Sequence, residues 1–457
     1  MSNVTKAVIL VVDIILFIIL LQTLPLDPAP AKGLALLIFI GILWLTEALH
    51  VTVTALLVPI LAAILGILPT NNALAMFADS NIFLFFGGFA LAAAMHIQKL
   101  DKMIAIRILH LAKGNFFLSV LYLFSVTAFL SMWMSNTATA AMLLPLAMGM
   151  LSNLDMQKNR NVFVFVLLGI AYSASIGGIG TLVGSPPNAI VASNLDVTFA
   201  EWFTYGMPVM IILMPVMILV MYLIFRPSMS IKVHEIDEAD IPMTKERVIT
   251  LAIFVFIALS WIFSSKINPI LSSAFGLEGK IASFDSVIAI IAAVLVVGFR
   301  VVTWKQVQEN CDWGVLYLFG GGLALSLVLS STGASKVLSD AVVVMMEGSH
   351  YYVIGLMIAF FIIFLTEFTS NTASAALLVP IFITIAESIG APPLGLALII
   401  GVGASCAFML PVATPPNAIV FGTGHIKQSE MVRTGVLLNV VSAVIVGSFG
   451  YFFWLQA

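Results

Sequence analysis

The sequence Ser135-Asn-Thr-Ala-Thr-Ala-Ala-Met-Leu-Leu-Pro145 interrupts an otherwise apolar stretch of the chain. It returns later as Ser370-Asn-Thr-Ala-Ser-Ala-Ala-Leu-Leu-Val-Pro380, which matches the first copy at eight of eleven positions. The two copies lie in different halves of the chain. A long polar-tipped motif that recurs in this way indicates that the chain contains an internal repeat.

Two further pairs of matches flank these motifs in the same order. Phe86-Gly-Gly returns as Phe319-Gly-Gly, and Pro186-Pro-Asn-Ala-Ile-Val191 returns unchanged as Pro415-Pro-Asn-Ala-Ile-Val420. The separation between the copies is nearly the same for all three pairs. Three ordered matches at nearly one offset are not expected by chance, so we interpret the chain as two homologous halves.

The composition is that of a protein embedded in a membrane. Hydrophobic residues make up 61% of 457 positions, charged residues only 9%, and the mean hydropathy is +1.15. A soluble protein of this length exposes far more polar surface. The first apolar stretch, Ala7–Leu24, is followed by prolines and not by a small-residue cleavage site, so we expect a retained helix. Cys311 and Cys406 predict no disulfide framework, the six histidines lack metal-ligand spacing, and we expect no nucleic-acid partner.

About eleven transmembrane crossings fit the apolar pattern, given that one crossing takes about 20 helical residues. Two of them start near Val162 and Leu394 and are interrupted late by Pro-Pro-Asn. Phe116–Leu151 and Tyr351–Ala386 are each about twice one crossing, with Ser-Asn-Thr near the middle, which predicts hairpins that return to their side of entry. The single crossings are Ala7–Leu24, Ala31–Leu49, Val51–Leu68, Ser80–His96, Pro208–Phe225, Val248–Ser264, Ser286–Phe299, Val315–Leu329 and Val436–Leu455.

The distribution of Lys and Arg orients this topology. With a cytoplasmic N-terminus and two returning hairpins, only Lys32, Lys266, Lys280 and Lys336 fall outside, which is the asymmetry that the positive-inside rule requires. The same parity is compatible with re-entrant hairpins and with paired full crossings. We therefore expect a multi-pass protein of the cell (inner) membrane with an external C-terminus. The basic residues predicted inside are Lys6, Lys99, Lys102, Arg107, Lys113, Lys158, Arg160, Arg226, Lys232, Lys245, Arg247, Arg300, Lys305, Lys427 and Arg433.

The predicted fold is all-α, with about eleven transmembrane helices and two re-entrant hairpins in an inverted repeat. An N-terminal helix, 1–30, precedes the first repeat, 31–225, which contains scaffold helices 31–113, hairpin 116–151, broken helix 162–196 and helix 208–225. A charged cytoplasmic linker, 226–247, precedes the second repeat, 248–457, which contains scaffold helices 248–329, hairpin 351–386, broken helix 394–424 and helix 436–455.

The interruptions have the chemistry of helix starts. Ser, Asn and Thr are favoured N-caps, and Ser185-Pro186 and Thr414-Pro415 place proline at the first helical position, where its missing N–H costs nothing. The sequence therefore predicts four half-helices that begin near the midplane: two after Ser-Asn-Thr and two at Pro-Pro-Asn. Each start carries partial positive charge, which suits an anion, while nearby carbonyl and side-chain oxygens suit a small cation.

Ionisable residues inside the apolar segments are few. Asp13 lies near a helix start and Glu47 near a helix end, where both can reach the interface, whereas Glu367 lies three residues before Ser370 and is the stronger functional candidate. The two Gly-Gly motifs are interpreted as close helix contacts. No Lys or Arg lies near either Ser-Asn-Thr motif within its apolar segment, so a divalent anion would need co-bound cations.

In these motifs the sequence resembles the divalent anion/sodium symporters, a family that includes sodium–dicarboxylate cotransporters. The run from Ala404 to Val420, Ala-Ser-Cys-Ala-Phe-Met-Leu-Pro-Val-Ala-Thr-Pro-Pro-Asn-Ala-Ile-Val, is similar to the family signature, and the paired Ser-Asn-Thr motifs are another hallmark. The resemblance spans nearly the whole chain. It implies a homodimer in which a transport domain slides against a scaffold, an elevator-type mechanism, with one sodium site in each repeat.

The resemblance also implies roles for particular residues. The first sodium site would comprise Ser131, Ser135, Asn136 and Gly184, and the second Thr366, Thr369, Asn371 and Ala413. Substrate carboxylates would meet Asn136, Thr137, Ser185, Asn371, Thr372, Thr414 and Pro415.

The function expected from sequence is sodium-coupled symport of C4-dicarboxylates such as succinate, fumarate and malate. Sodium ions would be the coupling ions, with no other cofactor. A sodium-independent di- or tricarboxylate exchanger of the same fold is the alternative. We do not expect an enzyme, because no nucleophile–base pair or intramembrane metal motif is visible, and a channel has little support.

Overall fold

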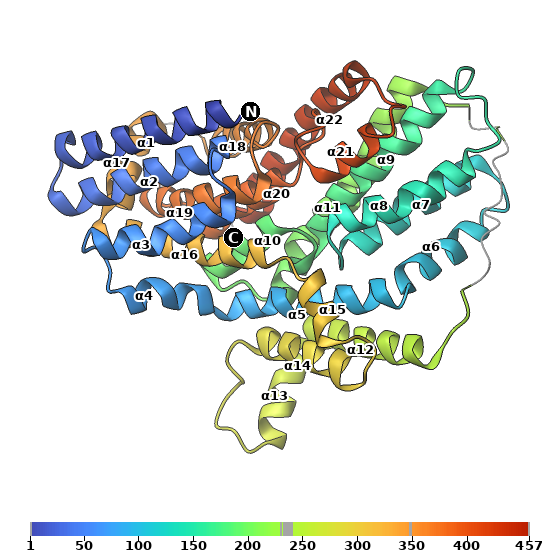
Figure 1. Ribbon diagram of the computed structural model, residues 1–457, viewed down its shortest axis with the longest axis horizontal. Coiled ribbons are helices and arrows are strands. Elements are labelled where there is room, and N and C mark those ends of the chain that lie inside the picture. Colours follow the sequence, from blue (N-terminus) through green and yellow to red (C-terminus); the bar gives the residue numbers. More distant parts are fainter. Residues whose placement is uncertain (1, 229–230, 232–240, 347–349, 456–457) are drawn as a thin grey trace.

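The computed structural model describes residues 2–228, 231, 241–346 and 350–455. All regular secondary structure in these ranges is helical (Figure 1). Half of the expected linker 226–247, namely residues 229–230 and 232–240, lies outside the described residues, as do residues 456–457 at the end of the second repeat.

The first half contains an N-terminal helix followed by scaffold helices, a helix pair and a broken helix. In chain order its elements are α1 (Asn3–Thr23), α2 (Pro28–Thr46), α3 (Val51–Ile64), α4 (Thr70–Ala75), η1 (Met76–Ala78), α5 (Ser80–Ile97), α6 (Leu100–His110), α7 (Phe116–Ser131), α8 (Asn136–Met150), α9 (Arg160–Gly177), η2 (Gly178–Gly180), η3 (Leu182–Gly184), α10 (Pro186–Leu195) and α11 (Phe199–Phe225).

The second half repeats the order of helix pair and broken helix. Its elements are α12 (Lys245–Ile262), α13 (Ser264–Ala274), α14 (Phe284–Gly298), α15 (Trp304–Asn310), α16 (Trp313–Thr332), α17 (Ala334–Met346), α18 (Tyr351–Leu365), α19 (Asn371–Ser388), α20 (Pro393–Ala404), α21 (Pro415–Phe421), α22 (Gln428–Phe449) and the π-helical η4 (Gly450–Trp454).

The helices of the described residues fit a multi-pass membrane protein, as the sequence predicts. Eight are long and apolar enough to cross a bilayer, or nine if α12 and α13 count as one span that bends by 98°. Five shorter apolar helices, among them α7 and α18 of the two helix pairs, complete the apolar set. The expected number of eleven crossings stays a prediction.

Two expected helices begin earlier than their apolar stretches. α11 starts at Phe199 and not at Pro208, because Thr198 and Glu201 form a reciprocal capping box ahead of the apolar residues. α22 starts at Gln428 and not at Val436, because the Glu430 carboxylate accepts a hydrogen bond (2.7 Å) from the backbone N–H of Lys427. In both cases the helix includes a polar first turn that hydropathy excludes.

Asp13 also differs from expectation. It is the eleventh residue of α1 and is buried against the neighbouring structure, with 2% of its surface exposed. The first turn of α1 precedes the apolar stretch, so Asp13 lies in the middle of the helix and not near its start.

Close helix contacts occur at both Gly-Gly motifs, as expected. A Cβ on Gly87 would overlap the Ala289 carbonyl oxygen, and a Cβ on Gly321 would lie 2.5 Å from the Ala55 Cβ. These glycines bring α5 against α14 and α16 against α3. Each pair joins a helix of one half to a helix of the other.

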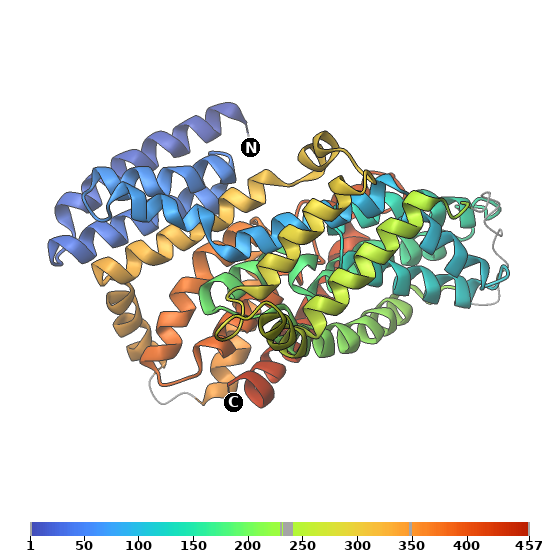
Figure 2. The same ribbon diagram turned by 90° about the horizontal axis from the view of Figure 1, so that it is seen from below.

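The helix pairs and broken helices pack together across the two halves (Figures 1 and 2). α7 and α8 lie against α9, and α18 and α19 lie against α20. The late segments cross over: α10 packs on α19 and α20, whereas α21 packs on α8 and α9. This exchange places four helix starts from different parts of the sequence around one region.

Candidate functional site

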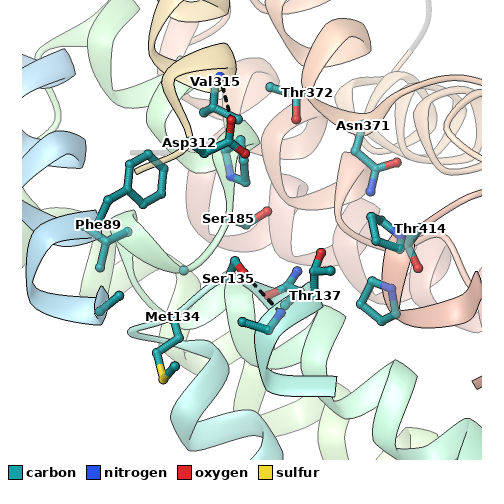
Figure 3. Close-up of a pocket in the computed structure, with 18 of the residues that line it drawn as sticks. Phe89, Met134, Ser135, Thr137, Ser185, Asp312, Val315, Asn371, Thr372 and Thr414 are labelled. Carbon is teal, nitrogen blue, oxygen red and sulfur yellow. Dashed lines mark hydrogen bonds between the residues drawn. The ribbon is translucent and has the colours of Figure 1, made fainter. Parts of the chain in front are cut away.

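Four helix N-termini meet at one cavity of about 1040 Å³. They are the starts of α8, α10, α19 and α21, at Asn136, Pro186, Asn371 and Pro415. Figure 3 shows Ser135, Thr137, Ser185, Asn371, Thr372 and Thr414 directed around the same space. Oriented backbone N–H groups at helix starts favour an anion, so the cavity can receive negative charge from several directions.

Side chains cap three of these four helices. Ser135 Oγ accepts from Ala138 N (3.2 Å), Ser370 Oγ accepts from Ala373 N (3.4 Å), and Thr414 Oγ1 accepts from Asn417 N (3.3 Å). At α10 the Ser185 hydroxyl instead shares a hydrogen bond of 3.1 Å with Ser405 Oγ from the other half. The N-cap chemistry expected from sequence therefore holds at three starts, and the fourth hydroxyl links the two broken helices.

The cavity brings together every residue that the sequence assigned to substrate. The lining includes Asn136, Thr137, Ser185, Asn371, Thr372, Thr414 and Pro415. Of the residues assigned to sodium, Ser135, Asn136, Gly184, Asn371 and Ala413 also line it, whereas Ser131, Thr366 and Thr369 do not. Ser131 is the last residue of α7, and Thr366 and Thr369 lie in the connection between α18 and α19.

Oxygen atoms cluster around Asn136 in the first half. Ser131 Oγ is fully buried and lies 2.5 Å from Asn136 Oδ1 and 2.7 Å from the Ala174 carbonyl oxygen. With the amide turned over, Asn136 Nδ2 would donate to the carbonyls of Ala174 (3.1 Å) and Gly184 (3.3 Å). With Oδ1 facing the cluster, four oxygens meet, an arrangement that a hard cation stabilises.

The corresponding residues of the second half make more local contacts. Thr366 Oγ1 donates to the Ile363 carbonyl (3.2 Å) and Thr369 Oγ1 donates to the Leu365 carbonyl (3.0 Å) of the same helix. Within the described part of the chain, Asn371 Oδ1 is buried without a hydrogen-bond partner. Its lone pairs are therefore unused, which is costly inside a protein unless a ligand takes them up.

Glu367 lies at the tip of the second helix pair and is fully buried. Its carboxylate accepts hydrogen bonds from Met409 N (2.8 Å), Leu410 N (2.9 Å) and Asn439 Nδ2 (2.6 Å). It thereby ties the tip to the break between α20 and α21 and to α22. The sequence singled out this residue, and its role in the structure is to satisfy a non-helical backbone at membrane depth.

Asn188 and Asn417 are buried residues to which the sequence analysis gave no role of their own. Each is the third residue of its half-helix, α10 or α21, and each donates from Nδ2 to two carbonyls of the preceding break. Their signal was present in the sequence, because both belong to the exact repeat Pro-Pro-Asn-Ala-Ile-Val.

The charged residues at the cavity are acidic. The carboxylates of Glu47, Glu309 and Asp312 belong to its lining together with His96, and among the described lining residues there is neither Lys nor Arg. Beside them Cys311 is buried, which raises the pKa of its thiol to about 12. Among the described lining residues, an anion would meet helix ends and hydroxyls but no Lys or Arg side chain.

The family model for the transmembrane region of sodium:sulfate symporters matches residues 1–456. The chain belongs to this family. The sequence resemblance to divalent anion/sodium symporters is thereby confirmed, and the protein is a membrane transporter and not an enzyme.

Two curated relatives illustrate the range of this symporter family. The chain is 64% identical over 451 residues to an uncharacterized transporter of Haemophilus influenzae, covering 99% of this chain and 98% of the relative. It is 34% identical over 490 residues to the sodium-dependent dicarboxylate transporter SdcS of Staphylococcus saprophyticus, covering 98% of this chain and 92% of the relative.

Solved structures of transporters share the fold of this protein at low sequence identity. The YdaH transporter of Alcanivorax borkumensis superposes with a TM-score of 0.60 at 14% identity, over 84% of this chain and 88% of its own. MtrF of Neisseria gonorrhoeae gives 0.55 at 15% identity, over 84% and 82%. At such identity the likeness describes the fold alone.

Proposed function

We propose that this symporter carries C4-dicarboxylates such as succinate, fumarate and malate into the cell together with sodium. The observation that carries the proposal is a cavity reached by four helix N-termini whose described lining holds no Lys or Arg. The relative SdcS, named as a sodium-dependent dicarboxylate transporter, supports the same substrate class.

The energetics of the cavity favour cation coupling. Moving a carboxylate out of water costs on the order of 20 kcal/mol in the idealised low-dielectric limit. A helix end returns only about 0.3–2 kcal/mol, whereas a cation a few ångströms away contributes about 4 kcal/mol at an effective dielectric near 20. The carboxylates of Glu47, Glu309 and Asp312 add repulsion for a dianion, so bound sodium has to balance the charge.

The residues that would hold each ion are those that the family resemblance implies, and the positions of several of their oxygens support this assignment. Oxygens of Ser131, Ser135, Asn136 and Gly184 would take the first sodium. The Asn371 Oδ1 atom, which has no hydrogen-bond partner among the described residues, supports a second site with Thr366, Thr369 and Ala413. The substrate carboxylates would lie against the starts of α8, α10, α19 and α21, beside Thr137, Thr372 and Thr414.

An elevator-type motion is our proposal for alternating access. The helix pairs and broken helices pack against one another across both halves and would move as one body. The paired helices α5–α14 and α3–α16 would belong to the opposing scaffold, and the resemblance to the family suggests a homodimer. The N-terminus would be cytoplasmic and the C-terminus external.

Uptake of labelled succinate into proteoliposomes tests the function. We expect accumulation only with an inward sodium gradient, and a sigmoidal dependence on external sodium, because at least two ions neutralise the dianion. Each further positive charge gains about 2.3 kcal/mol per 100 mV of membrane potential, so an interior-negative potential should raise uptake if a third ion moves. Equal uptake in sodium-free potassium or choline buffer would contradict sodium coupling.

One additional experiment distinguishes the symporter from the alternative, a sodium-independent exchanger. Vesicles preloaded with unlabelled succinate are placed in labelled succinate without sodium. A sodium-independent exchanger gives rapid counterflow under these conditions, whereas the symporter gives none until sodium is added on both sides.

A further inference from the structure

The breaks of the two broken helices share one hydrogen-bond pattern. Asn188 Nδ2 donates to the carbonyls of Gly178 (2.8 Å) and Thr181 (2.7 Å), ten and seven residues earlier. Asn417 Nδ2 donates to the carbonyls of Ala407 (3.2 Å) and Leu410 (3.0 Å), again ten and seven residues earlier. Because the same pattern occurs in both halves, we interpret it as a structural requirement of the breaks.

A buried break needs such a donor. The carbonyls of Gly178, Thr181, Ala407 and Leu410 lie beyond the ends of α9 and α20, where the regular hydrogen-bond ladder of the α-helix has stopped. The following half-helices begin with two prolines, which lack N–H groups. The side-chain amide of the next residue binds the Gly178 and Ala407 carbonyls and gives a second donor to the Thr181 and Leu410 carbonyls, which also accept from Gly184 N and Ala413 N.

Neither asparagine touches the substrate space. Asn188 and Asn417 are fully buried and are absent from the cavity lining, although the prolines beside them belong to it. Within the described residues their Oδ1 atoms have no hydrogen-bond partner. Each side chain is thus held by its two N–H bonds alone, and hydrophobic packing does not explain a buried amide that leaves its oxygen unused.

In the first half, the two hydrogen bonds of Asn188 hold backbone that lies next to the oxygens proposed to bind sodium. A Cβ on Gly178 would lie 2.6 Å from Asn136 Oδ1 and 2.9 Å from the Gly184 carbonyl oxygen. The bond from Asn188 to the Gly178 carbonyl therefore fixes backbone that touches the first sodium set.

In the second half, the two hydrogen bonds of Asn417 likewise hold backbone next to the second sodium set. The Leu410 carbonyl that it binds also accepts from Ala413 N (3.2 Å), and the Leu410 N–H donates to Glu367. Ala413 belongs to the second sodium set, and Glu367 belongs to the adjoining hairpin tip.

We propose that Asn188 and Asn417 are positioning residues that couple each anion-binding half-helix to the sodium set of its own half. Each asparagine is part of a helix start that lines the substrate cavity and is hydrogen-bonded to backbone that shapes the cation oxygens. The inference rests on the proposed sodium-coupled function and adds residues that act through others and not on the ions directly.

The test measures sodium and substrate separately in proteoliposomes. For Asn188→Ala and Asn417→Ala we expect the sodium concentration for half-maximal succinate uptake to rise about 10- to 100-fold, as for lost partners of metal ligands. The KM for succinate at saturating sodium should stay within about threefold. Asn194→Ala is the matched control, because Asn194 also lies on α10 but donates only to Ile190 of its own helix.

A second measurement separates positioning from folding. The sodium-induced rise in melting temperature of the purified protein, without succinate, should be lost in both alanine variants and reduced in the milder Asn188→Ser and Asn417→Ser. An unchanged sodium half-saturation, or an unchanged sodium-induced shift, would overturn the coupling role. Collapse of both the alanine and serine variants would assign the pair to folding alone. Wild-type protein without sodium activation would instead overturn the proposed function itself.

Discussion

The two hairpin tips, residues 132–135 between α7 and α8 and residues 366–370 between α18 and α19, carry nearly the same motif but are anchored by different forces. At the first tip, Trp133 stacks on Phe199 with centroids 5.9 Å apart, and Phe199 stacks on Trp261 at 4.9 Å. At the second tip the matched residue Phe368 is 70% exposed. Aromatic packing holds the first tip, whereas hydrogen bonds to Glu367 hold the second.

The breaks beside the tips show the same difference in exposure: the first-half residue is buried and the second-half residue is exposed. Val183 is 9% exposed and its counterpart Val412 is 83% exposed, although both precede the matched helix starts. Met132 occupies the first-half position that corresponds to Glu367, and its carbonyl accepts from the Thr181 hydroxyl. A sequence repeat therefore sets the local chain path in both halves without making their surroundings equal.

The largest expected effect comes from removing the anchor of the second tip. Glu367→Ala leaves two backbone N–H groups and the Asn439 amide without their acceptor, and should lower the free energy of unfolding by about 3–5 kcal/mol. Thermal unfolding of the purified protein in detergent measures the loss. Glu367→Gln, which keeps the shape and one acceptor, should lose less. An alanine variant as stable as wild type would mean that these bonds do not anchor the tip.

Removing the anchor of the first tip should cost less. Trp133→Ala takes away the stack on Phe199 and the edge contact with Phe254 (5.0 Å), and should destabilise by about 2–3 kcal/mol, because Trp133 is only partly buried. Trp133→Phe keeps an aromatic ring and is the control. The same unfolding assay applies, and equal stability of the alanine and phenylalanine variants would show that stacking contributes nothing.

Substituting the two asparagines proposed to bind sodium compares the two halves functionally. Asn136→Ala and Asn371→Ala should each weaken sodium activation and succinate affinity by about tenfold, since one buried ligand interaction is lost. Uptake kinetics over sodium and succinate concentrations measure both. If either variant retained wild-type sodium activation, the shared site would be wrong for that half.

The smallest effect is expected at the exposed counterpart of Trp133. Phe368→Ala should change the unfolding free energy by less than about 0.5 kcal/mol, because most of the ring contacts no other residue. The comparison with Trp133→Ala in the same assay sharpens the asymmetry. A loss as large as that of Trp133→Ala would show that the two tips are equally packed.

Much of the site was readable from sequence because the signals are local. Ser-Asn-Thr followed by apolar residues, and Pro-Pro after Ser or Thr, specify helix starts by capping and by the missing proline N–H. These rules predicted all four starts that line the cavity. They missed the polar first turn of α11, since hydropathy excludes Glu201 even where it closes a capping box.

The roles of Asn188 and Asn417 were not readable because their partners are set by the path of the break. The motif identifies each asparagine but not its partners. The carbonyls that the asparagine binds lie ten and seven residues earlier, and they come close to it only because the chain leaves one helix and begins the next. The exposure of Phe368 could not be predicted either, because the matched residue Trp133 packs against aromatic residues of α11 and α12.

The sequence by itself determined that this is a membrane protein with a duplicated set of helix breaks, since composition and capping act within a few residues. Only the tertiary structure decided that α10 and α21 each pack against helices of the opposite half and that four helix starts share one cavity. It also decided that aromatic packing holds one tip while hydrogen bonds to Glu367 hold the other. Those outcomes depend on contacts between segments that lie far apart in the sequence, and no local rule fixes which surfaces meet.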